Sequence, residues 1–119
     1  MLKTSITALA RQQLEIAKNA SSGRSAKTVH GGHERSLRQT VVALAAGRTM
    51  AEHQNPGEST VYVIYGRILL ATSSASWSGW LGDLIIVPDA LHSVEALEDS
   101  VILVRVAMQM TPSAAPEPT

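Results

Sequence analysis

The chain begins with a segment whose apolar positions follow the period of an α-helix. They recur three or four residues apart and therefore share one helical face: Ile6, Leu9, Ala10, Leu14 and Ala17. Thr4 or Ser5 can cap the start of this helix, and Gly23 follows its end. We therefore predict a helix over residues 5–20. A single helix of this length is marginal alone in water, so its apolar face must pack on its own domain or on a partner subunit.

The pattern changes after this helix. Residues 21–34 are polar and rich in glycine, which indicates a connector with one short strand at 27–30. Beyond Arg35, short apolar runs are separated by turn residues such as Asn55-Pro56-Gly57. The predicted strands are 37–45, 49–53, 60–65, 67–73, 76–80, 84–87, 92–96 and 101–108.

Many short strands at close spacing are typical of an all-β sandwich or barrel. We divide the chain into an N-terminal helix and connector at 1–34, a barrel domain at 35–110 and a disordered tail at 111–119. The tail contains only Thr, Pro, Ser, Ala and Glu, and such a segment cannot bury enough apolar surface to fold. The whole chain of 119 residues is large enough for one modest core.

The composition excludes several classes of function. Ten basic and ten acidic side chains cancel, and the basic residues form no run, so the electrostatic footprint of a nucleic-acid-binding protein is missing. No segment is apolar for long enough to cross a membrane. Arg11, Gln12 and Gln13 interrupt the N-terminal segment too early for a signal peptide. The chain has no cysteine, which excludes disulfides and thiolate metal sites. We expect a cytoplasmic protein.

Aromatic side chains are few, and two of them lie close together in the sequence. Trp77 and Trp80 fall in one predicted strand, three positions apart. Successive side chains of a strand alternate between its faces. The two indoles therefore face opposite sides, and at most one of them lines a cavity.

Two glycine-framed stretches carry the candidate chemistry. In the first, five residues separate Gly47 from His53. In the second, five residues separate Gly82 from Pro88, and His92 follows shortly after. Together these stretches resemble the paired motifs of the cupin superfamily, the RmlC-like jelly rolls.

The resemblance covers about residues 37–108, which is most of the chain. It implies an all-β, single-domain cupin, a β-barrel or double-stranded β-helix jelly roll behind an N-terminal helix. The chain is also similar to a group of small bacterial cupins that come with no established activity. Family resemblance further implies a homodimer, in which the helix or the first strand covers an exposed sheet edge.

The cupin pattern normally places three histidines and one carboxylate around a metal. His53 and His92 fill two of these four positions, Asn55 stands at the third, and Ser59 stands at the carboxylate position with Glu58 one residue early. The resemblance thus implies a site for a divalent metal such as Zn, Ni, Mn or Fe. Because two of the four usual ligands are replaced, we expect low occupancy or none.

Two residues outside this set are candidates to complete a metal site. Glu58 turns inward if a bulge shifts the register by one residue, because a single slip reverses the facing of a strand. His33 lies in the connector and can reach over the mouth of the barrel. Taken alone, each of His53 and His92 is better explained as a structural rim or turn residue. Because both stand in motifs with the expected glycine and proline framing, we predict that together they form an inward-facing pair, with or without a metal.

The predicted contacts to a bound molecule are Arg38 or Gln39, Asn55 and Ser59. Arg38 and Gln39 alternate along the first barrel strand, so only one of them can face the cavity. An inward Arg38 favours a carboxylate or phosphate ligand through its forked donors, whereas an outward Arg38 is simply part of the solvated face.

These features predict a small cupin that binds a small molecule, a divalent metal or both in its barrel, and they assign no specific reaction. One alternative is a metal-dependent dioxygenase or isomerase acting on a small organic acid, with His53 and His92 holding the metal. A second alternative is a structural or interaction dimer with an empty barrel.

Overall fold

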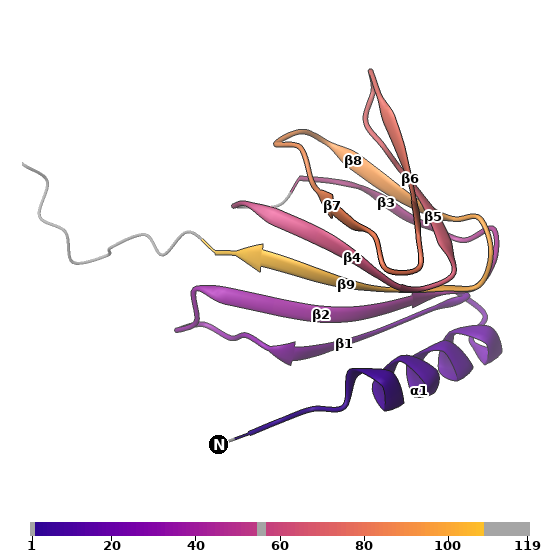
Figure 1. Cartoon of the computed structure of the whole chain (residues 1–119), viewed down its shortest axis with the longest axis vertical. Coiled ribbons are helices and arrows are strands. Elements are labelled where there is room, and N and C mark those ends of the chain that lie inside the picture. Colours follow the sequence, from indigo (N-terminus) through magenta and orange to yellow (C-terminus); the bar gives the residue numbers. More distant parts are fainter. Residues whose placement is uncertain (1, 55–56, 109–119) are drawn as a thin grey trace, which may run out of the picture.

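A computed structural model describes residues 2–54 and 57–108, which contain one helix and nine strands (Figure 1). The helix α1 is Ile6–Asn19. The strands are β1 Arg24–His30, β2 Leu37–Leu44, β3 Thr49–His53, β4 Ser59–Tyr65, β5 Arg67–Ala71, β6 Ser76–Trp80, β7 Leu84–Ile86, β8 His92–Ala96 and β9 Ser100–Ala107. The predicted tail at 111–119 lies outside the described residues.

The strands form two antiparallel sheets that pack face to face. The first has the order β1-β2-β9-β4-β7 and the second the order β3-β8-β5-β6. The side chains between them are mostly β-branched and aliphatic, and they form the main core: Val42, Leu44, Val61, Val63, Ile68, Leu70, Val94 and Ile102. The predicted all-β jelly roll with an N-terminal helix is therefore confirmed.

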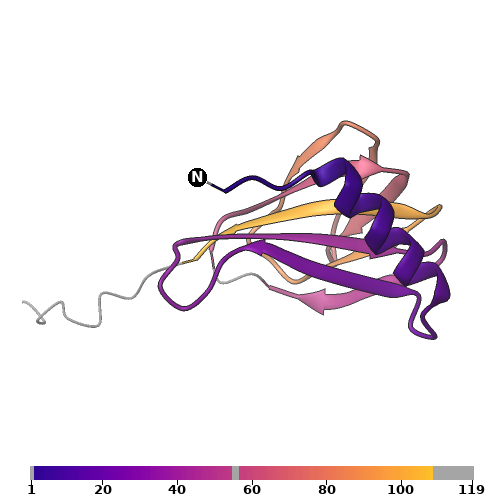
Figure 2. The same cartoon turned by 90° about the horizontal axis from the view of Figure 1, so that it is seen from below.

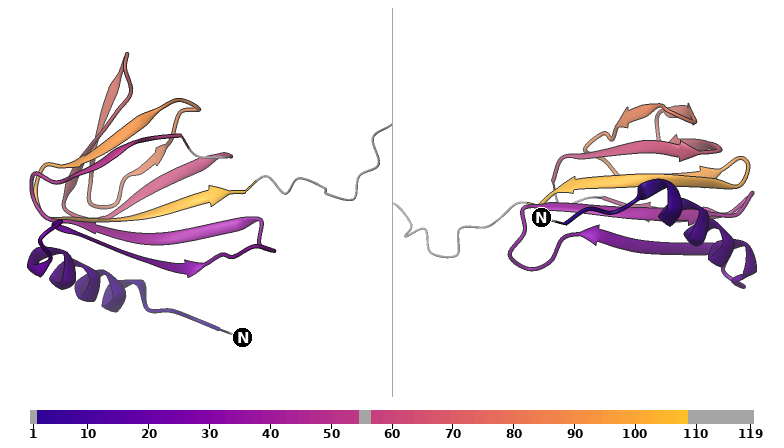
Figure 3. Two further views of the ribbon diagram at one scale, coloured as in Figure 1. Left: turned by 180° about the vertical axis from the view of Figure 1, so that it is seen from behind. Right: turned by 60° about the horizontal axis from the view of Figure 1, so that its bottom comes forward.

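The helix α1 packs on its own domain, against the outer face of the five-stranded sheet (Figures 2 and 3). The Ser5 hydroxyl caps it by accepting a hydrogen bond from the Ala8 amide at 3.2 Å. A second core lies beneath the helix and joins its apolar stripe to the sheet: Leu9, Ala10, Ala17, Val41, Ala43, Val101 and Leu103. Of the two predicted packing partners, the helix thus takes its own domain. No helix in the described residues is long and apolar enough to cross a membrane.

The strand bounds agree with the sequence pattern to within two residues, except for β1. This strand begins at Arg24 and not at position 27, and it pairs with β2 from Arg24↔Leu44 onward. Most of its side chains are exposed, because it is an edge strand of the sheet. An exposed polar edge strand carries little apolar alternation, so the sequence indicates only its last part.

The turn between β4 and β5 is closely packed around a glycine, and substitution of this glycine tests that packing. Gly66 has φ +83°, and a Cβ atom there would overlap the Asp99 carbonyl oxygen and the Ser100 hydroxyl. Gly47 has the same φ, but a Cβ atom added there would have nothing within 4 Å. Gly47→Ala should cost about 1 kcal/mol from backbone strain alone. Gly66→Ala should cost on the order of 3 kcal/mol or more, since overpacking adds to that strain. Urea unfolding measures both, and equal losses would contradict the packing of this turn.

Candidate functional site

An irregularity in strand pairing places His53 directly opposite His92. On β3 and β8, Met50 pairs with Val94 and His53 pairs with His92, so three residue steps on β3 match two on β8. In a regular strand, Met50 and His53 would face opposite sides. The extra residue is a β-bulge, which resets the facing of the strand. Met50 therefore packs against the core between the sheets, and the imidazole of His53 still meets that of His92.

The two imidazoles form a close, tilted pair. Their ring centroids are 4.5 Å apart and their planes differ by 54°. His92 is only 2% exposed, while His53 is half-buried. The pair thus lies at the end of the main core, with one ring shielded and the other reaching solvent.

Each imidazole is held by a carbonyl of its own strand or loop. The Nδ1 atom of His53 lies 3.0 Å from the Ala51 oxygen, and that of His92 lies 2.9 Å from the Ala90 oxygen. A carbonyl can only accept, so each Nδ1 carries the proton in the neutral ring. The Nε2 atoms are left as the basic nitrogens. A metal-binding histidine is commonly oriented in this way by a partner on its other nitrogen.

A side-chain hydrogen bond connects the segments on either side of the pair. Gln54 follows His53, and its Nε2 donates to Asp89 Oδ1 at 2.8 Å. Asp89 lies in the loop that leads to His92. This bond ties the end of β3 to the β7–β8 loop and so helps to fix the spacing of the two rings.

The other candidate ligands do not join the pair. Glu58 is exposed just before β4, and His33 is exposed on the β1–β2 turn. In the described part of the chain, no three histidine, aspartate or glutamate side chains gather in a group that could hold a metal ion. A role for Glu58 or His33 as a ligand stays a prediction that requires its segment to move. Asn55 lies outside the described residues.

The strand register separates Arg38 from Gln39. Arg38 shares the inner face of β2 with Val42 and Leu44, which belong to the core between the sheets. Its register partner is Val106 on β9, which in turn pairs with Ser59 on β4. Arg38 and the buried Ser59 thus lie in one row across the inner face.

Gln39 lies on the opposite, outer face of the same sheet. Its side-chain oxygen accepts a hydrogen bond from Nε of Arg105 at 3.0 Å. Of the two residues predicted to contact a bound molecule on this strand, Arg38 therefore has the position from which a ligand between the sheets can be reached.

The tryptophans lie on opposite faces of β6. Trp80 pairs with Arg67, whose guanidinium carbon lies 4.5 Å from the centre of its ring. Trp77 pairs with Leu70, a core residue of the inner face, yet it remains 41% exposed. This exposure follows from the position of β6 at the edge of its sheet. The row of Trp77, Leu70 and Val94 is next to the row of the histidine pair, and the end of the two sheets that carries this pair is called the open end below.

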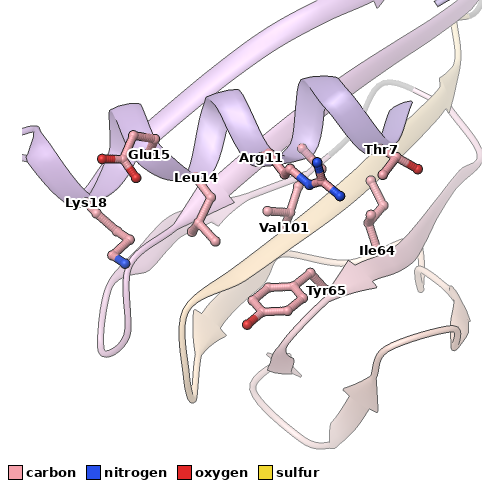
Figure 4. Close-up of a pocket in the computed structure, with 9 residues that line it drawn as sticks. Thr7, Arg11, Leu14, Glu15, Lys18, Ile64, Tyr65 and Val101 are labelled. Atoms are coloured by element: carbon pink, nitrogen blue, oxygen red, sulfur yellow. The ribbon is translucent and has the colours of Figure 1, made fainter. Parts of the chain in front are cut away.

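A groove that the sequence did not indicate lies outside the barrel, between α1 and the sheet (Figure 4). Its volume is about 570 Å³, and its walls come from the helix and from the β4 and β9 strands. Leu14, Ile64 and Val101 form its apolar floor, and Arg11, Glu15 and Lys18 stand on its helical side. It arises from packing between segments some fifty residues apart, so no local pattern indicates it.

Comparison with solved structures identifies the architecture. An RmlC-like cupin from Desulfovibrio desulfuricans matches with a TM-score of 0.63 at 22% identity, covering 71% of this chain and 81% of that one. The chain has the cupin fold. A conserved protein of unknown function from Streptococcus pyogenes matches with a TM-score of 0.67 at 21% identity, over 76% of this chain and 79% of the other. The DMSP lyase DddQ from Ruegeria pomeroyi matches with a TM-score of 0.64 at 19% identity, covering 74% of this chain and 48% of the lyase.

Comparisons at the sequence level add nothing to this assignment, because no family model and no curated protein matches the chain. The cupin fold predicted from the two glycine-framed motifs is nevertheless confirmed by the structural neighbours.

The carbonyl contacts of the imidazole pair predict its tautomers. In the neutral state, both His53 and His92 should carry the proton on Nδ1. The ¹⁵N chemical shifts and long-range ¹H–¹⁵N couplings of the side chains report this directly. His30, exposed on β1, should show the Nε2–H form that predominates in free histidine and serves as the internal reference. An Nε2–H form at either His53 or His92 would contradict the hydrogen bond of that ring to its backbone carbonyl.

Proposed function

We propose that this cupin binds a small molecule at the open end of its barrel, with a divalent metal held loosely by His53 and His92. The observation that carries the proposal is the imidazole pair, in which both Nδ1 atoms are bound to backbone carbonyls. Two basic Nε2 atoms on adjacent strands suit Zn, Ni, Mn or Fe. Such a metal supplies a Lewis acid that can orient and polarise an oxygen of the bound molecule.

The donor set fits weak metal binding better than a tight structural site. Structural zinc sites use four protein ligands and catalytic ones use three, whereas the described part of the chain brings two imidazoles together. The remaining positions would fall to water or to the bound molecule. Metal ligation also requires neutral imidazoles, so affinity should fall on acidification.

A second candidate function is catalysis on a small organic acid by a metal-dependent dioxygenase or isomerase. Open coordination positions, which two protein ligands leave in abundance, are what such chemistry needs. The similarity to a DMSP lyase supports the view that this fold can carry an active site, although it does not specify a reaction here. Arg38 would bind the acid and the imidazole pair would hold the metal.

Metal binding by the pair predicts a clear effect of mutation. His53→Ala and His92→Ala should each weaken Zn²⁺, Ni²⁺ or Mn²⁺ binding by at least tenfold, because one of two protein ligands is lost. His30→Ala should leave binding unchanged, since His30 is exposed on β1 and away from the pair. Equilibrium dialysis of untagged protein, freed of metal by chelation, makes the comparison. Unaltered metal uptake in both site variants would contradict metal binding by the pair. It would favour the alternative that the protein is a structural or interaction protein.

We also propose that the protein is a homodimer, joined through the outer face of the five-stranded sheet. The helix α1 packs mainly on β1, β2 and β9 and reaches β4 only near Ile64, so β7 and the first part of β4 lie beyond its cover. Ile85 packs into the core, so its neighbours Leu84 and Ile86 face outward, 54% and 71% exposed. A patch of this kind is typical of an interaction surface.

The shape of this face suits a second copy of the chain. The β7 ridge of Leu84 and Ile86 lies on one side of Tyr62, and the groove beneath α1 lies on the other. A two-fold axis near Tyr62 would place the ridge of each copy in the groove of the other, which is the self-complementarity that an isologous interface requires. Arg11 and Glu15 offer charges of both signs along the groove.

The dimer is tested by charging the ridge. Ile86→Lys should convert dimers to monomers at micromolar concentration, because a charge cannot be buried unpaired in an apolar interface. Leu97→Lys makes the same kind of change at an exposed leucine of the β8–β9 turn and should leave the dimer intact. Sedimentation velocity distinguishes the species. A monomeric wild type, or an Ile86→Lys variant that remains dimeric, contradicts this interface.

A further inference from the structure

A second pocket lies at the rim of the barrel, on the turn that joins β1 to β2. It has a volume of about 530 Å³, and the lining residues are Thr28, Gly31, Gly32, His33, Arg35, Arg38 and Met108. The turn lies at the same end of the molecule as the start of β4 and the end of β9 (Figure 1). Ser59, at the start of β4, shares the row of Arg38 on the inner face. The pocket is therefore on the rim of the open end, across from the strands that carry the imidazole pair.

The charge of this pocket has one sign. Arg35, Arg38 and His33 are its ionisable lining residues, and no aspartate or glutamate of the described residues lines it. Glu34, the acidic neighbour in the turn, is exposed and does not contribute to the lining. In a protein whose formal net charge is zero, two guanidinium groups around one pocket are a local excess of positive charge, and the imidazole of His33 adds a further hydrogen-bonding group.

Arg38 is the more buried of the two arginines in this pocket. Its side chain is half-buried, and within residues 2–54 and 57–108 it has no side-chain hydrogen bond and no ion pair. Partial burial of a guanidinium without a partner is costly, because its hydration is reduced and nothing replaces it. A bound oxyanion compensates for the lost hydration by accepting hydrogen bonds from the forked N–H groups of the guanidinium.

The backbone of the turn makes room for this arginine. A Cβ atom on Gly31 would lie 3.0 Å from Cγ of Arg38, which is closer than a methyl group can sit without displacing it. The glycine therefore lets the arginine stem pack directly on the turn. The neighbouring Thr28 hydroxyl lies 3.2 Å from that of Thr40 and adds a neutral hydrogen-bonding group to the pocket wall.

We infer that the rim pocket binds the doubly charged oxyanion group of a small molecule, either a phosphomonoester or neighbouring carboxylates. Two arginines and a histidine match two negative charges better than one, and planar guanidinium groups bind both kinds of oxyanion in a bidentate manner. The volume leaves space for a whole small metabolite. This extends the proposed function by giving the bound molecule its chemical class, and the pocket itself does not require a metal at His53 and His92.

Calorimetric titration tests this pocket, with protein that has been stripped of metal by a chelator and then dialysed free of the chelator, at constant ionic strength. Inorganic phosphate is the probe for a phosphomonoester, and citrate is the probe for neighbouring carboxylates. Acetate is the singly charged control. Saturable binding of phosphate or citrate, at least tenfold tighter than acetate, is expected. A preference between the first two probes identifies the phosphomonoester or the polycarboxylate as the natural class.

Matched variants separate a built site from general attraction. Arg38→Gln should weaken binding at least tenfold and Arg35→Gln several-fold. Arg24→Gln removes the same charge at the far, exposed end of β1 and should have no effect. Equal losses in Arg24→Gln and Arg38→Gln, or no saturable binding of either polyanion, overturn the inference. Because metal is absent from this titration, a negative result would not argue against metal binding by the imidazole pair. Loss of metal uptake in His53→Ala would likewise not argue for or against the rim pocket.

Discussion

The alternation of side chains along β9 is the constraint on which the cupin fold of this chain depends. This strand is the centre of the five-stranded sheet, with β2 on one side and β4 on the other. Val101 and Leu103 face the helix, whereas Ile102 and Val106 face the space between the sheets. A period of two therefore gives the molecule two apolar layers from a single strand. It also separates an outer surface suited to a partner from an inner surface suited to a ligand.

At the open end, the inner surface changes from apolar to polar within one row of residues. Val104 belongs to the margin of the main core, and the next row holds Arg38, Val106 and Ser59. Across from it, the β3 bulge places the imidazole of His53 against that of His92. Packing of the apolar core thus fixes where these arginine, serine and histidine side chains lie. Their function depends on which molecule binds to them.

Much of the fold could be predicted from the sequence, because its signals are local. The helix has a visible period and a serine cap, and Gly66 marks the junction of two strands. The meeting of His53 and His92 was expected from the cupin resemblance, but the bulge that produces it has no local signal, because it exists only in the pairing with β8. The start of β1 was missed because an exposed edge strand needs no apolar pattern. The rim pocket joins residues 28–38 to Met108, a proximity that only the sheet register creates.

The central claim, that the imidazole pair is the metal-binding point of the open end, can be tested by titrating Mn²⁺ into ¹⁵N-labelled protein. Paramagnetic broadening falls steeply with distance, so the amide signals nearest the ion disappear first. At substoichiometric Mn²⁺, the account predicts early loss of the signals of His53 and His92 and of their neighbours on β3 and β8, with α1 unaffected. Early loss around His30 or His33 instead, or uniform broadening across the chain, would contradict it.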